Sequence, residues 1–158
     1  MGERNGMVTG VGGAGKWRGG PSLVCEFGPR FDPMIAAYIG NGSKYPPNGI
    51  LGGAAGRSSE AYKITEEGEK VELPLISDGE EIQPGERIGS YNSGGGGYGD
   101  PLERDPEMVR DDVKREVVST EGARNEYGVV LQTQDGERIV EQQETKRLRE
   151  RLQTEASE

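Results

Sequence analysis

Short apolar runs bounded by glycine and proline recur through the first ninety residues. The runs Ser22–Phe27 and Met34–Ile39 are typical of β-strands, and the second is apolar enough to be buried on both faces. Three more strands are predicted over residues 61–65, 71–75 and 82–90, at a spacing typical of an all-β sandwich or barrel edge. Turns are expected at Asn41-Gly42, Glu67-Gly68, Ser77-Asp78-Gly79 and, inside the last strand, Gln83-Pro84-Gly85.

From residue 105 onward the apolar positions recur at helical spacing. Val109, Val113 and Val117 form one apolar stripe. Asp105 and Pro106 stand immediately before it, as an N-cap and a first-turn proline. The pattern therefore predicts a helix that begins at this Asp-Pro pair.

Two further helices are expected beyond this one. Ser119 can cap a short helix that ends near residue 126, and Gly128 stands in the usual position after a helix. Residues 127–131 are expected to form a short strand, followed by a turn at 134–136. The last helix is predicted over residues 140–153, where Leu148 and Leu152 lie one turn apart.

Four consecutive glycines, Gly94 to Gly97, join the β-rich part of the chain to the helical part. A run without Cβ atoms lets another backbone approach closely, whereas an unsupported run would be a flexible linker. The capping signals that follow favour a shaped turn. We therefore predict one α+β domain built from a glycine-rich loop 1–20, a β-rich part 21–92, a glycine turn 93–104, a helical part 105–153 and a frayed tail 154–158.

The composition is poor in apolar side chains. Hydrophobic residues make up 31% of the 158 residues and glycine supplies 27 positions, so little apolar surface is available for a self-sufficient core. We infer that the domain packs against something larger. The charged fraction of 30% and the net charge of −9 leave the alternative of a partly disordered chain, chiefly at its two ends.

Charge and cysteine usage exclude several classes of function. A net charge of −9 argues against a nucleic-acid surface, and no apolar run is long enough to span a membrane. The chain shows no signal-peptide pattern, and its single cysteine, Cys25, cannot form an internal disulfide. We therefore expect a cytoplasmic protein, in which Cys25 is a buried strand thiol.

Two phosphate-binding motifs nearly occur near the N-terminus. Residues 10–15 fit G-x-G-x-x-G, but a dinucleotide site needs a strand before the motif and a helix after it, and Gly19-Gly20-Pro21 breaks any helix. Residues 10–16 also fit G-x-x-x-x-G-K, but Trp17 occupies the position where a P-loop needs Ser or Thr. Neither motif predicts a nucleotide site.

The sequence contains no histidine. This removes the commonest general base and the commonest transition-metal ligand. The carboxylate pairs Glu66-Glu67, Glu80-Glu81 and Asp111-Asp112 lie beside turns or on a helix face, where solvated charge is expected. A turn carboxylate such as Asp100 could hold a hard cation, but we assign no catalytic, cofactor-binding or metal-binding residue.

Large side chains framed by glycine loops are the better candidates for function. Such residues are typical of a binding rim or a subunit contact, although they could equally cover the β layer or pair locally. The candidates for an interface or an active-site rim are Lys16, Trp17, Arg18, Tyr45, Arg57, Gly94, Gly95, Gly96, Gly97, Tyr98 and Asp100.

Three of these glycine-framed segments carry a family resemblance. They are residues 13–20 (GAGKWRGG), residues 44–49 (KYPPNG) with Gly52-Gly53, and residues 94–107 (GGGGYGDPLERDPE) followed by a V-x-x-D-V pattern at 109–113. In this order they resemble blocks at the C-terminal end of the hydantoinase B/5-oxoprolinase family, which is related to subunits of acetone and acetophenone carboxylases. The resemblance covers nearly the whole chain.

The resemblance implies a role within a larger enzyme. In this family an ATP-binding A component activates a cyclic amide or a ketone enolate by phosphorylation, and the B component completes hydrolysis or carboxylation. The metal-binding residues of the B component lie in an N-terminal part that has no counterpart here. The resemblance thus implies no cofactor on this chain, and places ATP, Mg²⁺ and a divalent metal on partner subunits.

Two functional hypotheses follow. In the first, the chain is a non-catalytic subunit in a hetero-oligomer, where it completes the fold of a larger hydantoinase B-like chain that works with an ATP-binding hydantoinase A-like chain. In the second, it is a free-standing binding or regulatory domain with the same fold and no catalysis. A split subunit should expose a large apolar patch and depend on partners, whereas an autonomous domain should be a stable monomer.

Overall fold

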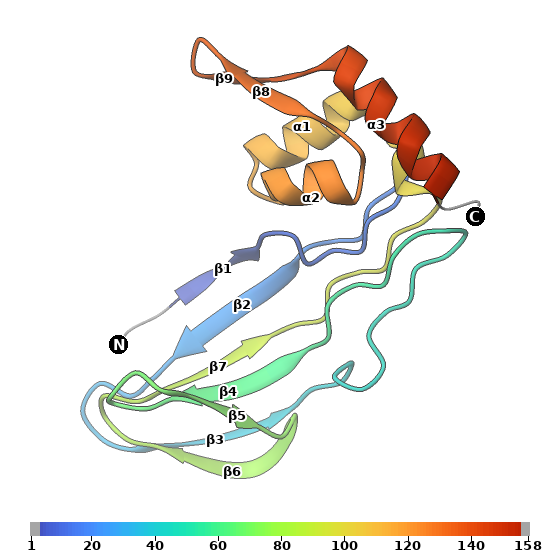
Figure 1. Cartoon of the computed structure of the whole chain (residues 1–158). Coiled ribbons are helices and arrows are strands. Elements are labelled where there is room, and N and C mark those ends of the chain that lie inside the picture. Colours follow the sequence, from blue (N-terminus) through green and yellow to red (C-terminus); the bar gives the residue numbers. More distant parts are fainter. Residues whose placement is uncertain (1–3, 156–158) are drawn as a thin grey trace.

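The structure, a computed structural model, describes residues 4–155 and has a β-rich body and a smaller helical part joined by extended glycine-rich runs (Figure 1). This is the predicted α+β class. Five antiparallel strands form the larger sheet, in the spatial order β1 (Arg4–Val8), β2 (Ser22–Phe27), β7 (Arg87–Tyr91), β4 (Glu60–Ile64) and β5 (Lys70–Leu73).

The alternation of side chains along the strands gives the larger sheet two different faces. In β2, Val24 is buried, whereas Leu23, Cys25 and Phe27 on the opposite face are exposed. The expectation of a buried Cys25 was therefore wrong. An apolar run predicts a strand, but it does not say which of the two alternating faces another layer will cover.

A second sheet of two antiparallel strands lies beside the first. It consists of β3 (Met34–Ile39) and β6 (Ile76–Ile82). Residues of β3 face residues of β4 and β7 across a cleft of about 770 Å³. β3 alternates between half-buried and exposed positions, so within residues 4–155 it is not buried on both faces as the sequence predicted.

The helical part contains α1 (Pro106–Lys114), α2 (Thr120–Asn125), α3 (Gln142–Glu155) and a hairpin of β8 (Leu131–Gln134) and β9 (Glu137–Val140). Both predicted caps are present, because the Asp105 carboxylate accepts from the Glu107 N–H at 2.9 Å and the Ser119 hydroxyl from the Gly122 N–H at 2.9 Å. No helix within residues 4–155 has the length and apolar character needed to cross a membrane.

The helical part has its own core. The predicted stripe of Val109, Val113 and Val117 is buried. Val109 and Val113 pack in one cluster with Ala123, Tyr127 and other apolar side chains, and burial raises the pKa of the Tyr127 hydroxyl to about 12. This cluster stabilises the helices, which are too short to be stable alone.

Several predicted boundaries were wrong. Residues 4–8 form strand β1 where a loop was expected, and the strand predicted over 127–131 begins only at Leu131. The turn predicted at residues 77–79 lies inside β6, whereas the turn at 83–85 separates β6 from β7. Asn41-Gly42 does not close a hairpin, because β3 pairs with the distant β6. Of the predicted frayed tail, residues 154–155 belong to α3 and 156–158 lie outside the described residues.

The glycine-rich runs are interlocked by backbone hydrogen bonds. The run 93–99 lies among the runs 10–20 and 47–57, and its N–H groups donate to carbonyl oxygens of both. Gly95 donates to Gly20 at 2.9 Å and Gly97 to Ala54 at 2.9 Å. We call this arrangement the glycine bundle. The predicted glycine turn is thus the middle of a packed layer of backbones.

The backbones in the glycine bundle lie too close together for side chains. A Cβ atom on Gly94, Gly96 or Gly97 would lie closer than 3.0 Å to a backbone carbonyl oxygen, in the run 10–20 for Gly94 and Gly97 and in the run 47–57 for Gly96. The Val11 and Ala14 carbonyls accept hydrogen bonds from the Arg57 and Ala54 N–H groups, and the backbone cannot give way as the end of a flexible side chain can. The sequence GGGG is therefore a packing requirement at this point.

The glycine bundle predicts different effects at two of its glycines. We expect Gly96→Ala to lower the free energy of unfolding by at least about 2 kcal/mol, because the new methyl group would overlap the Asn48 carbonyl. Gly20→Ala is the matched control, since a Cβ atom there meets nothing within 4 Å. Urea unfolding of both variants measures the difference. Equal stability of the two would contradict this account of the bundle.

Candidate functional site

One end of the glycine bundle carries a cluster of exposed apolar side chains. Trp17 and Tyr98 form an antiparallel bridge, with reciprocal backbone hydrogen bonds of 3.0 and 2.9 Å, and Ile50 pairs with Tyr98 from the other side. Trp17, Ile50 and Tyr98 are 58%, 59% and 48% exposed. Together with Leu51 we call these residues the bundle tip. It brings together two predicted candidates, Trp17 and Tyr98, from opposite ends of the β-rich part.

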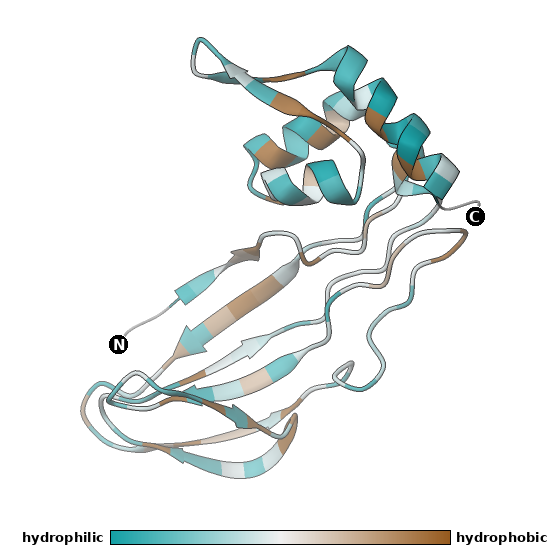
Figure 2. Ribbon diagram, in the orientation of Figure 1, coloured by the Kyte–Doolittle hydropathy of each residue, from teal (hydrophilic) through white to brown (hydrophobic). Residues whose placement is uncertain are grey.

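Leu51, in the turn at the bundle tip, has an unfavourable backbone conformation and an exposed side chain. Leu51 has a φ of +51° and is followed by Gly52 at +90°. The left-handed region is uncommon for a leucine, and the side chain is also 71% exposed to solvent. In the hydropathy view the turn stands out as an apolar projection beyond the body (Figure 2). A strained backbone and an exposed apolar side chain at one residue favour a binding role for this turn.

Arg18 is half-buried and connects the glycine bundle to the helical part. Its Nε lies 3.0 Å from the Asp112 carboxylate of α1, and its Nη1 donates to the Gly19 carbonyl at 2.9 Å. Arg104 contacts the same carboxylate at 2.8 Å and donates to the Lys16 carbonyl at 2.9 Å. Asp112 is 5% exposed. We call Arg18, Arg104 and Asp112 the arginine clamp, because they hold two parts of the fold together.

Arg149 extends the same junction from α3. Its guanidinium donates to the carbonyl oxygens of Tyr127 and Arg104, at 3.0 and 2.8 Å. Burial disfavours its charge and lowers the pKa of the guanidinium from the ordinary value. The side chain thus ties the last helix to the segment that leaves the glycine bundle.

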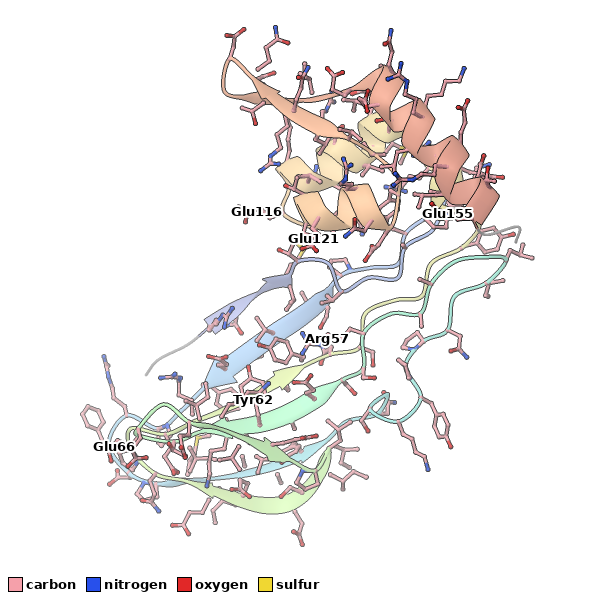
Figure 3. The ribbon with its side chains drawn as sticks, viewed as in Figure 1. Arg57, Tyr62, Glu66, Glu116, Glu121 and Glu155 are labelled. Atoms are coloured by element: carbon pink, nitrogen blue, oxygen red, sulfur yellow. The ribbon has the colours of Figure 1, made fainter. Side chains whose placement is uncertain are left out.

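Arg57 lies at the other end of the glycine bundle, where it meets the five-stranded sheet (Figure 3). Its guanidinium is 4.3 Å from the centre of the Tyr91 ring and 2.7 Å from the Glu60 carboxylate. Lys70 also contacts Glu60, at 2.9 Å. Hydrogen bonds from Lys70 and Arg57 hold the pKa of the Glu60 carboxyl below its ordinary value.

Beneath this group the sheet contains a buried polar pair. The Tyr62 hydroxyl donates to the Glu26 carboxylate at 2.7 Å, and burial together with this carboxylate raises the pKa of the hydroxyl. The Tyr62 and Tyr91 rings are 5.3 Å apart. Arg57 therefore belongs to a packed structural cluster on the sheet.

The remaining candidates lie in simpler environments. Lys16 forms an exposed ion pair with Glu103 at 3.0 Å. Tyr45 is 78% exposed on the loop before the second glycine-rich run. The Asp100 carboxylate accepts from the Leu102 N–H at 2.8 Å and caps the 3₁₀ turn Pro101–Glu103. This carboxylate therefore has a local structural role.

Sequence reasoning missed four residues that define the site. Asp112 was taken as solvated, but it follows Val109 by three positions on the buried side of α1, so it faces Arg18 and Arg104. Asp111, one position away, is exposed and pairs with Arg110. The apolar pair Ile50-Leu51 was a usable signal, because it stands between glycines. No local signal marked Arg104.

The donors in the N-terminal glycine motif are used within the fold. The N–H groups of Gly10 and Gly13 donate to the carbonyl oxygens of Val117 and Gly95, each at 2.8 Å. After β1 the chain enters the glycine bundle and forms no helix. Two donors of the motif are therefore used within the fold, and the motif does not stand at the N-terminus of a helix, where a dipole would favour a phosphate.

Comparisons with known proteins agree with the resemblance in the sequence. The family model described as hydantoinase B/oxoprolinase matches residues 1–101. The caprolactamase subunit beta of Pseudomonas jessenii is 38% identical over 136 residues, which cover 82% of this chain and 23% of that protein. The crystal structure of the ATP-dependent caprolactamase from the same organism has a TM-score of 0.76 at 29% identity, covering 93% of this chain and 25% of that one.

A nucleotide-free acetone carboxylase structure has the same fold. Its TM-score is 0.75 at 23% identity, and the match covers 96% of this chain and 24% of that one. The chain therefore spans about a quarter of the length of the relatives it matches.

The arginine clamp predicts unequal effects at two adjacent aspartates. We expect Asp112→Asn to lower the free energy of unfolding by about 3–5 kcal/mol, because two guanidinium groups lose the carboxylate they share in a buried site. Asp111→Asn, its exposed neighbour, should leave stability unchanged. Thermal and urea unfolding of both variants measure the effects, and a stable Asp112→Asn protein would contradict the clamp.

The Glu60 cluster predicts a pH dependence. The pKa of Glu60 is lower in the folded than in the unfolded chain, so its stabilisation is present above the ordinary value of 4.5 and is lost as the pH falls through the folded value. We expect Glu60→Gln to lose part of the fall in unfolding free energy between about pH 6 and pH 3. Glu72→Gln, at an exposed glutamate on β5, is the control. If the unfolding free energy of Glu60→Gln falls with pH as in the wild-type chain, the stabilisation does not come from Glu60.

Proposed function

We propose a function from one established premise, that the chain belongs to the hydantoinase B/oxoprolinase family. In this proposal it is a small non-catalytic subunit of an ATP-dependent enzyme and completes the fold of a larger hydantoinase B-like chain. The observation that carries the proposal is the 38% identity to the caprolactamase subunit beta, which is itself a subunit of a larger enzyme. In the proposal, the larger B-like chain supplies the parts of the enzyme that lie beyond this fold.

The exposed apolar surface supports a role as a subunit. Contiguous apolar patches on a protein surface favour protein–protein contact. One group of exposed apolar side chains is the bundle tip. Others are Met7, Leu23 and Phe27 on the five-stranded sheet, and Ile35, Ile39 and Ile76 on the β3–β6 sheet. A chain that works alone in water would be expected to cover more of these side chains.

The donor atoms of this chain do not fit the divalent metal that the family implies. The sequence contains no histidine, and residues 4–155 include no group of three or more His, Cys, Asp or Glu side chains that could hold an ion. We therefore place ATP and Mg²⁺ on the hydantoinase A-like chain and the divalent metal on the larger B-like chain. This chain contributes no catalytic step, and its part is to bind and position its partners in a cytoplasmic hetero-oligomer.

We further propose cyclic-amide hydrolysis as the reaction of the complex, in preference to ketone carboxylation. Caprolactam is a cyclic amide, and the caprolactamase subunit is 38% identical to this chain. The likeness to acetone carboxylase, at 23% identity, supports the shared fold alone. In either reaction the bundle tip would lie at a contact between subunits.

This proposal predicts a stable complex. The chain, mixed with the larger B-like chain and the A-like chain from the same source, should elute from a sizing column as one species that contains all three. Its thermal unfolding midpoint should rise in the mixture, because a partner that binds only the folded chain stabilises it by mass action. Mass determination of the peak checks the result.

The opposite result has a clear meaning. A folded monomer with an unchanged midpoint in the presence of both chains would overturn the subunit role. It would leave the second hypothesis, a free-standing binding or regulatory domain.

The proposal also predicts an activity of the complex. The complex should hydrolyse a cyclic amide such as caprolactam only when ATP is present, and omission of this chain should lower the rate of hydrolysis.

A further inference from the structure

We propose that the outer face of the β3–β6 sheet is the surface on which the larger B-like chain packs, and that the contacting surface of that chain is apolar with lysine or arginine at its rim. We call this surface the isoleucine face. It consists of Ile35, Ile39 and Ile76 with Glu81 beside them. The inference rests on the proposed function and names the surface through which that function operates.

The sequence of β3 is that of a strand covered on both sides. MIAAYI contains no charge and no proline, and its side chains are apolar or aromatic at every position. Strands that are buried on both faces have this near-continuous apolar pattern, whereas a strand with one face in water alternates apolar with polar residues. In the structure the outward side chains Ile35 and Ile39 are 76% and 86% exposed. The pattern therefore predicts that another layer packs on the outward face of β3, and residues 4–155 do not provide that layer.

The outer face is continuous across both strands. Ile39 and Ile76 are directly opposite each other in the antiparallel register, and Ile35 is opposite Glu81. Ile76 is 66% exposed. Directly opposite residues in an antiparallel pair project to the same side of the sheet. The three isoleucines thus form one apolar surface.

The β3–β6 sheet is also weakly supported from within. It has only two strands in the part of the chain that the structure describes, and isolated two-stranded sheets are marginally stable in water. Its inner face borders the cleft of about 770 Å³, so that face is incompletely packed as well. An apolar cover on the outer face would therefore stabilise this sheet.

The negative charge beside the isoleucine face indicates which kind of chain packs on it. Glu81 and Asp78 are exposed on β6, and the whole chain carries a net charge of −9. A second copy of this chain on the same face would bring carboxylates of the two copies together, which is unfavourable. A larger chain with a basic rim would pair with them. Relatives about four times as long contain this fold within one polypeptide, so their additional length is sufficient to supply such a cover.

The test uses a double variant of the outward isoleucines. Ile35→Thr/Ile39→Thr keeps the β-branched shape and alters only exposed positions, so we expect an unchanged fold by circular dichroism. Its affinity for the larger B-like chain, titrated in the presence of the A-like chain, should fall by about tenfold or more. Met108→Ser, at an exposed apolar residue on α1, is the matched control and should bind like the wild-type chain.

The rim has its own variant. Glu81→Gln should weaken the binding and make it less dependent on salt, because one charge that attracts the basic rim is removed. An unchanged salt dependence would contradict a basic rim on the partner.

Hydrogen exchange tests the same contact without substitutions. In the wild-type complex, amide hydrogen exchange should slow at residues 34–39 and 76–82 relative to the free chain.

The outcomes separate this inference from the function on which it rests. If the wild-type chain binds the larger chain while the double variant binds equally well and exchange at β3 and β6 is unchanged, the isoleucine face is overturned and the subunit role stands. If the wild-type chain does not bind, both fail. If the wild-type chain self-associates and the double variant is monomeric, a second copy covers the face, and the assignment to the larger chain is wrong.

Discussion

The rest of the structure depends on the contact between glycine backbones in the bundle. Gly94, Gly96 and Gly97 each face a carbonyl oxygen of one of the two neighbouring runs, 10–20 and 47–57, at a distance that leaves no room for a Cβ atom. Hydrogen bonds between neighbouring segments replace the side-chain packing that such a layer would otherwise need. Glycine loses much conformational entropy when it is ordered, so this layer forms only because the segments are held by hydrogen bonds to one another. It explains how a chain with 31% hydrophobic residues builds an ordered body.

The glycine bundle also sets the positions of the functional side chains. Its runs leave the five-stranded sheet beside Arg57 (Figure 3) and reach the bundle tip, where Trp17 and Tyr98 pair. The arginine clamp fixes the helical part to the same layer, since Arg18 belongs to a glycine run and Asp112 to α1. A buried carboxylate and hydrogen-bonded backbone therefore connect α1 to the bundle tip.

The β-rich body differs from the glycine bundle, because apolar side chains on its strands are exposed. β2 exposes Leu23, Cys25 and Phe27 on one face, and β3 exposes Ile35 and Ile39. Both strands have sequences that would suit a buried position. The proposed role as a subunit that completes a larger fold would account for this property, because the surfaces that join such a subunit to its partner are apolar.

The sequence by itself determined the local elements of this protein. The strand Ser22–Phe27, the helix that begins after Asp105, the cap at Ser119 and the family membership could all be read from patterns within a few residues. Only the tertiary structure decided that β3 pairs with β6 some forty residues later, that Asp112 is buried while Asp111 is not, and that Leu51 projects at the bundle tip. Pairing, burial and exposure depend on contacts between segments far apart in the chain, and a local pattern carries no information on which distant segment will cover it.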